Sequence, residues 1–185
     1  MRSYVFLTVA ALCCFAAASA FSAGRPSGKL NPNHVPSSAC VDKVPVLNDS
    51  TPSTDQSPYT LTVSSTLASP GDVIQVYASG FDGALFKGLF MQARVVGADV
   101  NDAVGQFTSE NEGRNPAVRR STCPPGENNA ISYMSRTGIP SITLDWKVPE
   151  DVPTEGYSIF FRATIMESFP RFWTNVDSPP IAIRA

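Results

Sequence analysis

Three arginines ahead of the last cysteine form the densest basic group in the sequence. Arg114, Arg119 and Arg120 lie in a polar segment that precedes Cys123 and also contains Asn and Glu. A guanidinium group pairs bidentately with phosphate, so arginines on one loop could hold the phosphorylated sugars of a bacterial outer surface. The alternative is an ordinary solvated face. We retain the three arginines as candidate ligand-binding residues.

Aromatic side chains offer a second way to bind sugars, because sugar rings stack on exposed indole or phenol faces. The candidates are Tyr133, Phe172 and Trp173. Trp146 has a different context: it ends an alternating run with Ile142 and Leu144. That spacing is typical of a core residue.

Catalytic and metal-binding motifs are not evident. The single histidine, His34, lies in a loop-like segment, whereas a Ser-His-carboxylate set needs a histidine held by packing. The segment from Asp99 to Asp102 lacks the spacing and the closing acid of a calcium loop. We therefore predict no catalytic residues, no metal site and no cofactor.

The four cysteines divide between two parts of the chain. Cys13 and Cys14 lie in the apolar N-terminal run, which leaves Cys40 and Cys123. In an oxidising compartment these two should form one disulfide. The alternative is a pair of free or metal-binding thiols, for which two cysteines and a distant histidine are a poor zinc set.

The N-terminus has the three parts of a secretory signal. Arg2 is followed by an apolar run from Val5 to Ala18 and by a small-residue cleavage site at residues 18–20. We expect residues 1–20 to be a signal peptide, 21–39 an extended N-terminal arm and 40–185 one domain, secreted and extracellular. Asn48 begins an Asn-Asp-Ser glycosylation motif.

Charge and hydropathy exclude two classes of partner. The chain has 14 basic and 16 acidic residues, a formal net charge of −2. A balance so mild predicts no global attraction to nucleic acid or to anionic membranes. No apolar run after the leader is long enough to cross a bilayer, so no stable membrane insertion is expected.

Short alternating runs separated by turn residues predict an all-β antiparallel sandwich of the immunoglobulin-like type, with about eight strands. In the run from Tyr157 to Ile165, alternate residues place an apolar face on the core, with Phe160 and Arg162 together on the other face. The expected strands are Tyr59–Val63, Val73–Tyr77, Leu89–Val96, Ala103–Phe107, Ala130–Met134, Ser141–Trp146, Tyr157–Ile165 and Ile181–Ile183.

A set order of motifs carries a family resemblance. The motifs are Val35 to Cys40, Ser57-Pro58-Tyr59, Pro70-Gly71, Phe86 to Arg94, Val104 to Phe107, Cys123, Leu144-Asp145-Trp146, Phe161 to Thr164 and Phe172-Trp173. The F-K-G-x-x-x-Q-A-R string from Phe86 to Arg94 is the most specific of them. From about Pro36 onward the sequence resembles a reeler domain, in the stand-alone form of secreted invertebrate defence proteins.

The resemblance implies an antiparallel β-sandwich, a Cys40–Cys123 bridge and extracellular recognition, chiefly in innate immunity. The leading hypothesis is a secreted defence protein, not an enzyme, that binds lipopolysaccharide or cell-wall glycans and has an antimicrobial effect. Its contacts would come from the loop arginines and the aromatic side chains. The alternative is an extracellular-matrix or adhesion module that binds host proteins, as the domain does within larger molecules.

Overall fold

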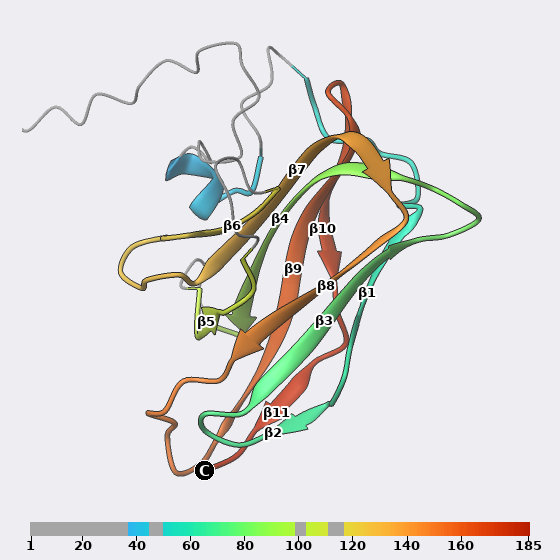
Figure 1. Cartoon of the computed structure of the whole chain (residues 1–185). Coiled ribbons are helices and arrows are strands. Elements are labelled where there is room, and N and C mark those ends of the chain that lie inside the picture. The colour runs from blue at the N-terminus through green and yellow to red at the C-terminus, as the bar shows by residue number, and fades with distance from the viewer. Residues whose placement is uncertain (1–36, 45–49, 99–102, 111–116) are drawn as a thin grey trace, which may run out of the picture.

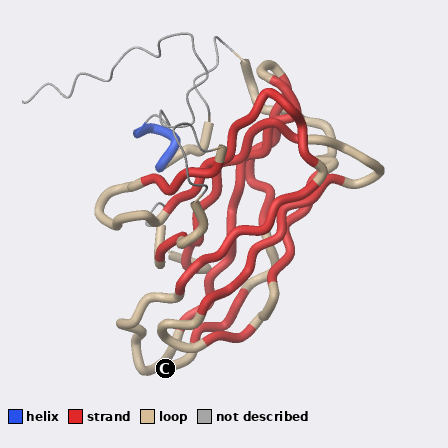
Figure 2. The backbone as a smooth tube through the Cα atoms, viewed as in Figure 1, coloured by secondary structure: helices blue, strands red, loops and turns tan. Residues whose placement is uncertain are grey.

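The computed structural model describes residues 37–44, 50–98, 103–110 and 117–185. The expected signal peptide, His34, Asn48, the segment from Asp99 to Asp102 and Arg114 lie outside these ranges. The described residues form two β-sheets packed face to face (Figure 1). Strands account for most of the described chain, and long loops join the ends of the sandwich (Figure 2).

The smaller sheet has four strands in the order β1-β3-β8-β5. Their bounds are Tyr59–Val63 for β1, Val73–Gly80 for β3, Ser141–Lys147 for β8 and Gln106–Phe107 for β5. Along β3 the residues alternate between buried (Ile74, Val76, Ala78) and more exposed. This alternation is what a strand with one face on the core requires.

The larger sheet has seven strands, in the order β2-β11-β9-β4-β7-β6 with β10 also paired to β9. Their bounds are Leu67–Ala68 for β2, Phe86–Val95 for β4, Val118–Ser121 for β6, Ala130–Ile139 for β7, Tyr157–Ser168 for β9, Arg171–Asp177 for β10 and Ile181–Ile183 for β11. The central strand β9 pairs with β4 on one side and with β10 and β11 in succession on the other.

The hydrophobic core lies between the two sheets. In β9, residues Ile159, Phe161, Ala163 and Ile165 are all fully buried, as their spacing predicts. The Phe161 ring meets the fully buried Trp146 ring edge to face, with centroids 5.3 Å apart. The prediction that Trp146 is a core residue is confirmed.

The predicted all-β sandwich with one disulfide is confirmed, with three further strands and one parallel pair. The strands β2, β6 and β10 were not predicted, and β2 runs parallel to β11. The expected strand from Ala103 to Phe107 narrows to the two residues of β5 and one bridge from Ala103 to Arg94. A four-residue 3₁₀ helix, Ser37–Cys40, forms at the end of the segment 21–39 that was expected to be extended.

Two structural features explain why the alternation of apolar and polar residues did not predict β10. Register shifts interrupt its pairing with β9 at Arg171/Phe172 and between Trp173 and Val176. Asn175 adopts a positive φ of 56° within the irregular stretch. A bulge places adjacent residues on the same side of a strand, which removes the alternation.

No helix within the described ranges is long and apolar enough to span a membrane.

Candidate functional site

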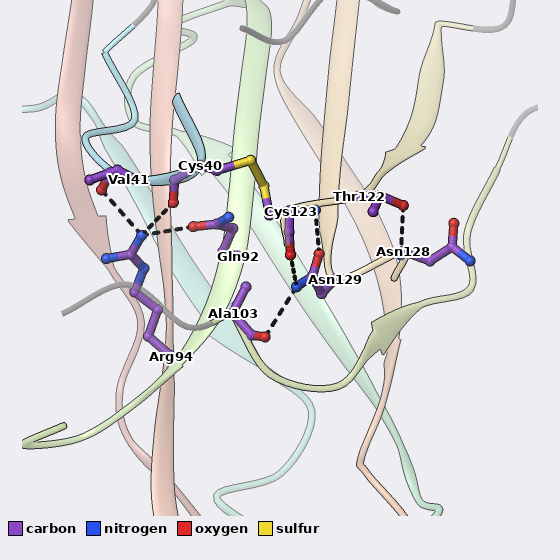
Figure 3. The surroundings of a disulfide bond; sticks show 9 residues. All are labelled: Cys40, Val41, Gln92, Arg94, Ala103, Thr122, Cys123, Asn128 and Asn129. Atoms are coloured by element: carbon purple, nitrogen blue, oxygen red, sulfur yellow. Dashed lines mark hydrogen bonds between the residues drawn. A yellow bond between two sulfur atoms is a disulfide. The ribbon is translucent and has the colours of Figure 1, made fainter. Parts of the chain in front are cut away.

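The disulfide fixes a short N-terminal segment on the outer face of the larger sheet (Figure 3). Cys40 and Cys123 are bonded and their Cα atoms lie 5.5 Å apart, which confirms the predicted bridge. We call residues 38–44 the covering segment. Within it, Ala39 is 3% exposed and packs with Phe90, Cys123 and Ala130 in a small apolar cluster separate from the main core.

Two polar side chains of β4 lie under the covering segment. Gln92 is 0% exposed and Arg94 is 8% exposed, and the two are hydrogen-bonded to each other. The Nη2 of Arg94 donates to the carbonyl oxygens of Cys40 (3.0 Å) and Val41 (3.3 Å) and to Oε1 of Gln92 (2.9 Å). Through these bonds Arg94 both orients the side-chain amide of Gln92 and holds the covering segment against β4.

Asn129 supports the other end of the disulfide, and sequence reasoning missed it. Its side chain is 1% exposed and accepts from the backbone N–H of Cys123 at 2.8 Å. Its Nδ2 donates to the carbonyl oxygens of Cys123 (2.8 Å) and Ala103 (3.2 Å). The available signal was an Asn six residues after a cysteine, in a Pro- and Gly-rich turn where side chains replace backbone partners.

Lys43 is the most unusual charged group of the covering segment. It is 3% exposed, and its carbonyl oxygen accepts a 2.7 Å bond from the Thr164 hydroxyl of β9. Burial lowers the pKa of Lys43 to about 7, and repulsion from Arg94 and Arg162 acts in the same direction. Burial and the two nearby guanidinium groups disfavour the charged form of the Lys43 amine, so its pKa falls.

The lowered pKa of Lys43 predicts a pH-dependent stability. In the unfolded chain the pKa returns toward 10.5, so between pH 7 and 10.5 the unfolded state binds more protons than the folded state. Stability should therefore rise with pH, by about 3 kcal/mol between pH 7 and 9.5. Urea denaturation across this range measures the rise.

The matched control is a second lysine. Lys43→Met should abolish most of the pH dependence of the unfolding free energy, whereas Lys87→Met, at an exposed position of β4, should retain it. Equal slopes in Lys43→Met and the parent protein would contradict the assignment.

Arg162 lies on the same outer face and behaves as its spacing predicts. Its guanidinium carbon sits 4.9 Å from the centroid of the Phe160 ring. Its Nε and Nη2 donate to the two carboxylate oxygens of Asp177 at 2.7 and 2.6 Å. This hydrogen-bonded carboxylate raises the pKa of Arg162, so the guanidinium stays charged.

The two described candidate arginines lie on a strand, not on a loop. In β6, Arg119 pairs in register with Ser132 and Arg120 with Ile131, so the two side chains point to opposite faces. Arg120 forms a 2.6 Å ion pair with Glu110. The Nε of Arg119 is buried without a hydrogen-bond partner in the described ranges. The structure therefore separates these two members of the expected cluster, and their role in ligand binding stays a prediction.

The expected exposure of the aromatic candidates is wrong. Trp173 is 3% exposed, Tyr133 6% and Phe172 0%. Trp173 packs edge to face on Tyr59 and its Nε1 donates to the carbonyl of Asp55 at 3.1 Å. Tyr133 meets Phe86 edge to face at 5.9 Å. These rings stabilise the core, so a sugar cannot stack on them without displacing their packing partners.

The remaining chemistry of the described residues is limited. No group of three or more His, Cys, Asp or Glu side chains able to hold a metal occurs within the described ranges. What the geometry presents is a covalently fixed covering segment, a polar cluster beneath it and separated surface charges. This arrangement defines the molecule as a disulfide-linked β-sandwich.

The chain belongs to the Reeler domain family, whose model matches residues 38–185. Among solved structures, it is similar to the human F-spondin reeler domain, with a TM-score of 0.57 and 15% identity. That match covers 74% of this chain and 96% of the F-spondin domain. At this identity the likeness concerns the fold, and it agrees with the sandwich described above.

Two relatives show how the domain is used in other chains. A protein of Locusta migratoria named "Putative defense protein" is 37% identical over 156 residues, covering 80% of this chain and 79% of its own length. The Bos taurus "Ferric-chelate reductase 1" is 28% identical over 162 residues, covering 88% of this chain but 24% of its own length. The first relative matches over most of both chains, which supports a defence-like role at the family level.

Proposed function

We propose that this protein is a secreted defence protein that acts by binding microbial surface polymers rather than by catalysis. The observation that carries the proposal is the similarity to insect proteins named as defence proteins, in Locusta migratoria and also in Bombyx mori, where 30% identity extends over 80% of this chain and 82% of the relative. The sequence signal expected over residues 1–20 supports secretion.

The fold gives this proposal a physical basis. A sandwich with a disulfide across 83 residues presents strands whose backbone is already ordered and therefore loses little freedom on binding. Arg119 and Arg120 remain candidate contacts for phosphorylated sugars, now as separate positions on β6. Within this proposal Asn48 carries a surface glycan and any antimicrobial effect follows from binding.

A pull-down of the purified protein on lipopolysaccharide, peptidoglycan and β-glucan tests the proposal. We expect retention on at least one polymer at levels at least about tenfold above an unrelated β-sandwich of similar charge. Retention on none of them, with capture by insoluble host matrix instead, would favour the adhesion-module alternative and end the defence proposal.

A further inference from the structure

The outer face of the four-stranded sheet carries a set of polar side chains, all but one of them uncharged. Because alternate residues of β1, β3 and β8 are buried, the residues between them point away from the core. Thr62, Tyr77 and Thr143 lie in one register row across the three strands. We define the polar face as Thr62, Gln75, Tyr77, Ser79, Thr143 and Asp145, all of them exposed or half-buried.

The centre of the polar face is held in place by side-chain hydrogen bonds. The hydroxyl of Tyr77 donates to Oε1 of Gln75 at 2.8 Å, and Nε2 of Gln75 donates to Oδ1 of Asp145 at 3.2 Å. Ordering a free surface side chain on binding costs about 0.5–1.5 kcal/mol. A chain of three side chains fixed in advance avoids part of that cost, which is a property of a preorganised binding surface.

The side chains of the polar face still have unused hydrogen-bond donors and acceptors. The Gln75 amide has a second N–H, the Asp145 carboxylate has a second oxygen, and the hydroxyls of Thr62 and Thr143 both donate and accept. The Tyr77 phenol adds an amphipathic ring between the two threonines. Sugar hydroxyls need such a mixture of donors and acceptors beside a ring.

Charge identifies the kind of ligand. Asp145 is the only charged member of the polar face, and the neighbouring Lys147 is ion-paired with Glu150 at 2.7 Å. A polyanion such as lipopolysaccharide would bring its phosphates toward this carboxylate, and Lys147, the cation that the described residues place beside it, is already ion-paired. An uncharged ligand meets no such penalty.

The dimensions suit a linear polymer. Ser79, Tyr77 and Gln75 follow one another on the same face of β3, so they extend over about 14 Å, while adjacent strands lie about 4.8 Å apart. In Figure 1 the strands β3 and β8 run side by side in front of β4 and β9. The face therefore extends about 14 Å along the strands and about 10 Å across β1, β3 and β8.

We propose that this polar face is the binding site for a neutral polysaccharide chain, with Tyr77, Gln75 and Asp145 at its centre. The inference rests on the proposed function and names the ligand class and surface that would carry it out. It also places the site on the sheet opposite the one that holds the candidates Arg119, Arg120, Tyr133, Phe172 and Trp173.

The test compares variants of the full chain on one probe, a neutral β-glucan, by pull-down and by calorimetry with a soluble oligosaccharide of the same glucan. Tyr77→Ala and Gln75→Ala should each weaken binding at least about tenfold. Thr143→Arg should abolish it, because a long cationic side chain would cover the row. Phe81→Ala, which removes an aromatic side chain 57% exposed on the β3–β4 turn, is the matched control and should bind as the parent does.

The outcomes separate the two proposals. If the parent binds β-glucan and Tyr77→Ala binds equally well, the polar face is not the site while the proposed function survives. If the parent binds lipopolysaccharide alone, and Thr143→Arg does not reduce that binding, the neutral-ligand inference is overturned. If the parent binds no microbial polymer, the proposed function itself fails. Circular dichroism and unfolding midpoints of the variants, all at surface positions, establish that each is folded.

Discussion

Replacing both Cys40 and Cys123 by serine is expected to lower the free energy of unfolding by about 4 kcal/mol. The disulfide closes a loop across 83 residues, and a loop of that length removes denatured-state entropy equivalent to about 4–5 kcal/mol. The covering segment should also detach, because its own contacts are few and include the buried Lys43. Urea denaturation followed by tryptophan fluorescence measures the loss.

Two comparisons make this result specific to the bridge. Asp42→Ala changes an exposed residue of the same segment whose carboxylate accepts from the backbone N–H of Val44, and should alter stability by less than about 0.5 kcal/mol. Hydrogen exchange at Phe90 and Gln92 should rise in the double serine variant. A loss below about 1 kcal/mol with unchanged exchange would mean that the non-covalent contacts suffice to hold the segment.

The sequence predicted the fold well where period-two alternation is regular. The buried face of β9 and the core position of Trp146 both follow from alternation alone. The disulfide partners follow from counting cysteines after removal of the expected leader. The strand β6 was missed because Arg119 and Arg120 made a four-residue edge strand look like a polar loop.

The candidate site was harder to predict, for a physical reason. Phe172 and Trp173 pair with consecutive residues of β9 and so face opposite sides of the sheet, yet both are buried. Alternation along the strand predicts that one of two neighbouring rings is exposed, and it does not show that both faces of the sheet are covered at this point. By contrast, the separation of Arg119 from Arg120 follows directly from strand geometry once the strand is known. Arg94 shows the same limit: two of its hydrogen-bond acceptors are carbonyl oxygens 54 and 53 residues away in the sequence.

Replacement of Trp146 by alanine is expected to cost about 3–5 kcal/mol of unfolding free energy, a large share of the stability of a domain of this size. The side chain is fully buried and its Nε1 donates to the carbonyl of Val104 at 3.0 Å. Gly105 lies so close that a Cβ there would collide with the indole, so the backbone is shaped around this ring. Truncation leaves both a cavity beside Phe161 and an unsatisfied carbonyl.

Trp146→Phe separates these two costs. It retains a ring against Phe161 but removes the N–H donor, so we expect a loss of about 1–2 kcal/mol, mainly from the carbonyl of Val104 and the smaller volume. Thr143→Ala, on the exposed face of the same strand, should change stability by less than about 0.5 kcal/mol. Because β8 carries Trp146 inward and Thr143 and Asp145 outward, these variants also test whether the proposed glycan surface owes its position to the core packing beneath it. If it does, a folded Trp146→Phe variant should bind β-glucan as the parent does, while Trp146→Ala should lose binding in proportion to its unfolded fraction.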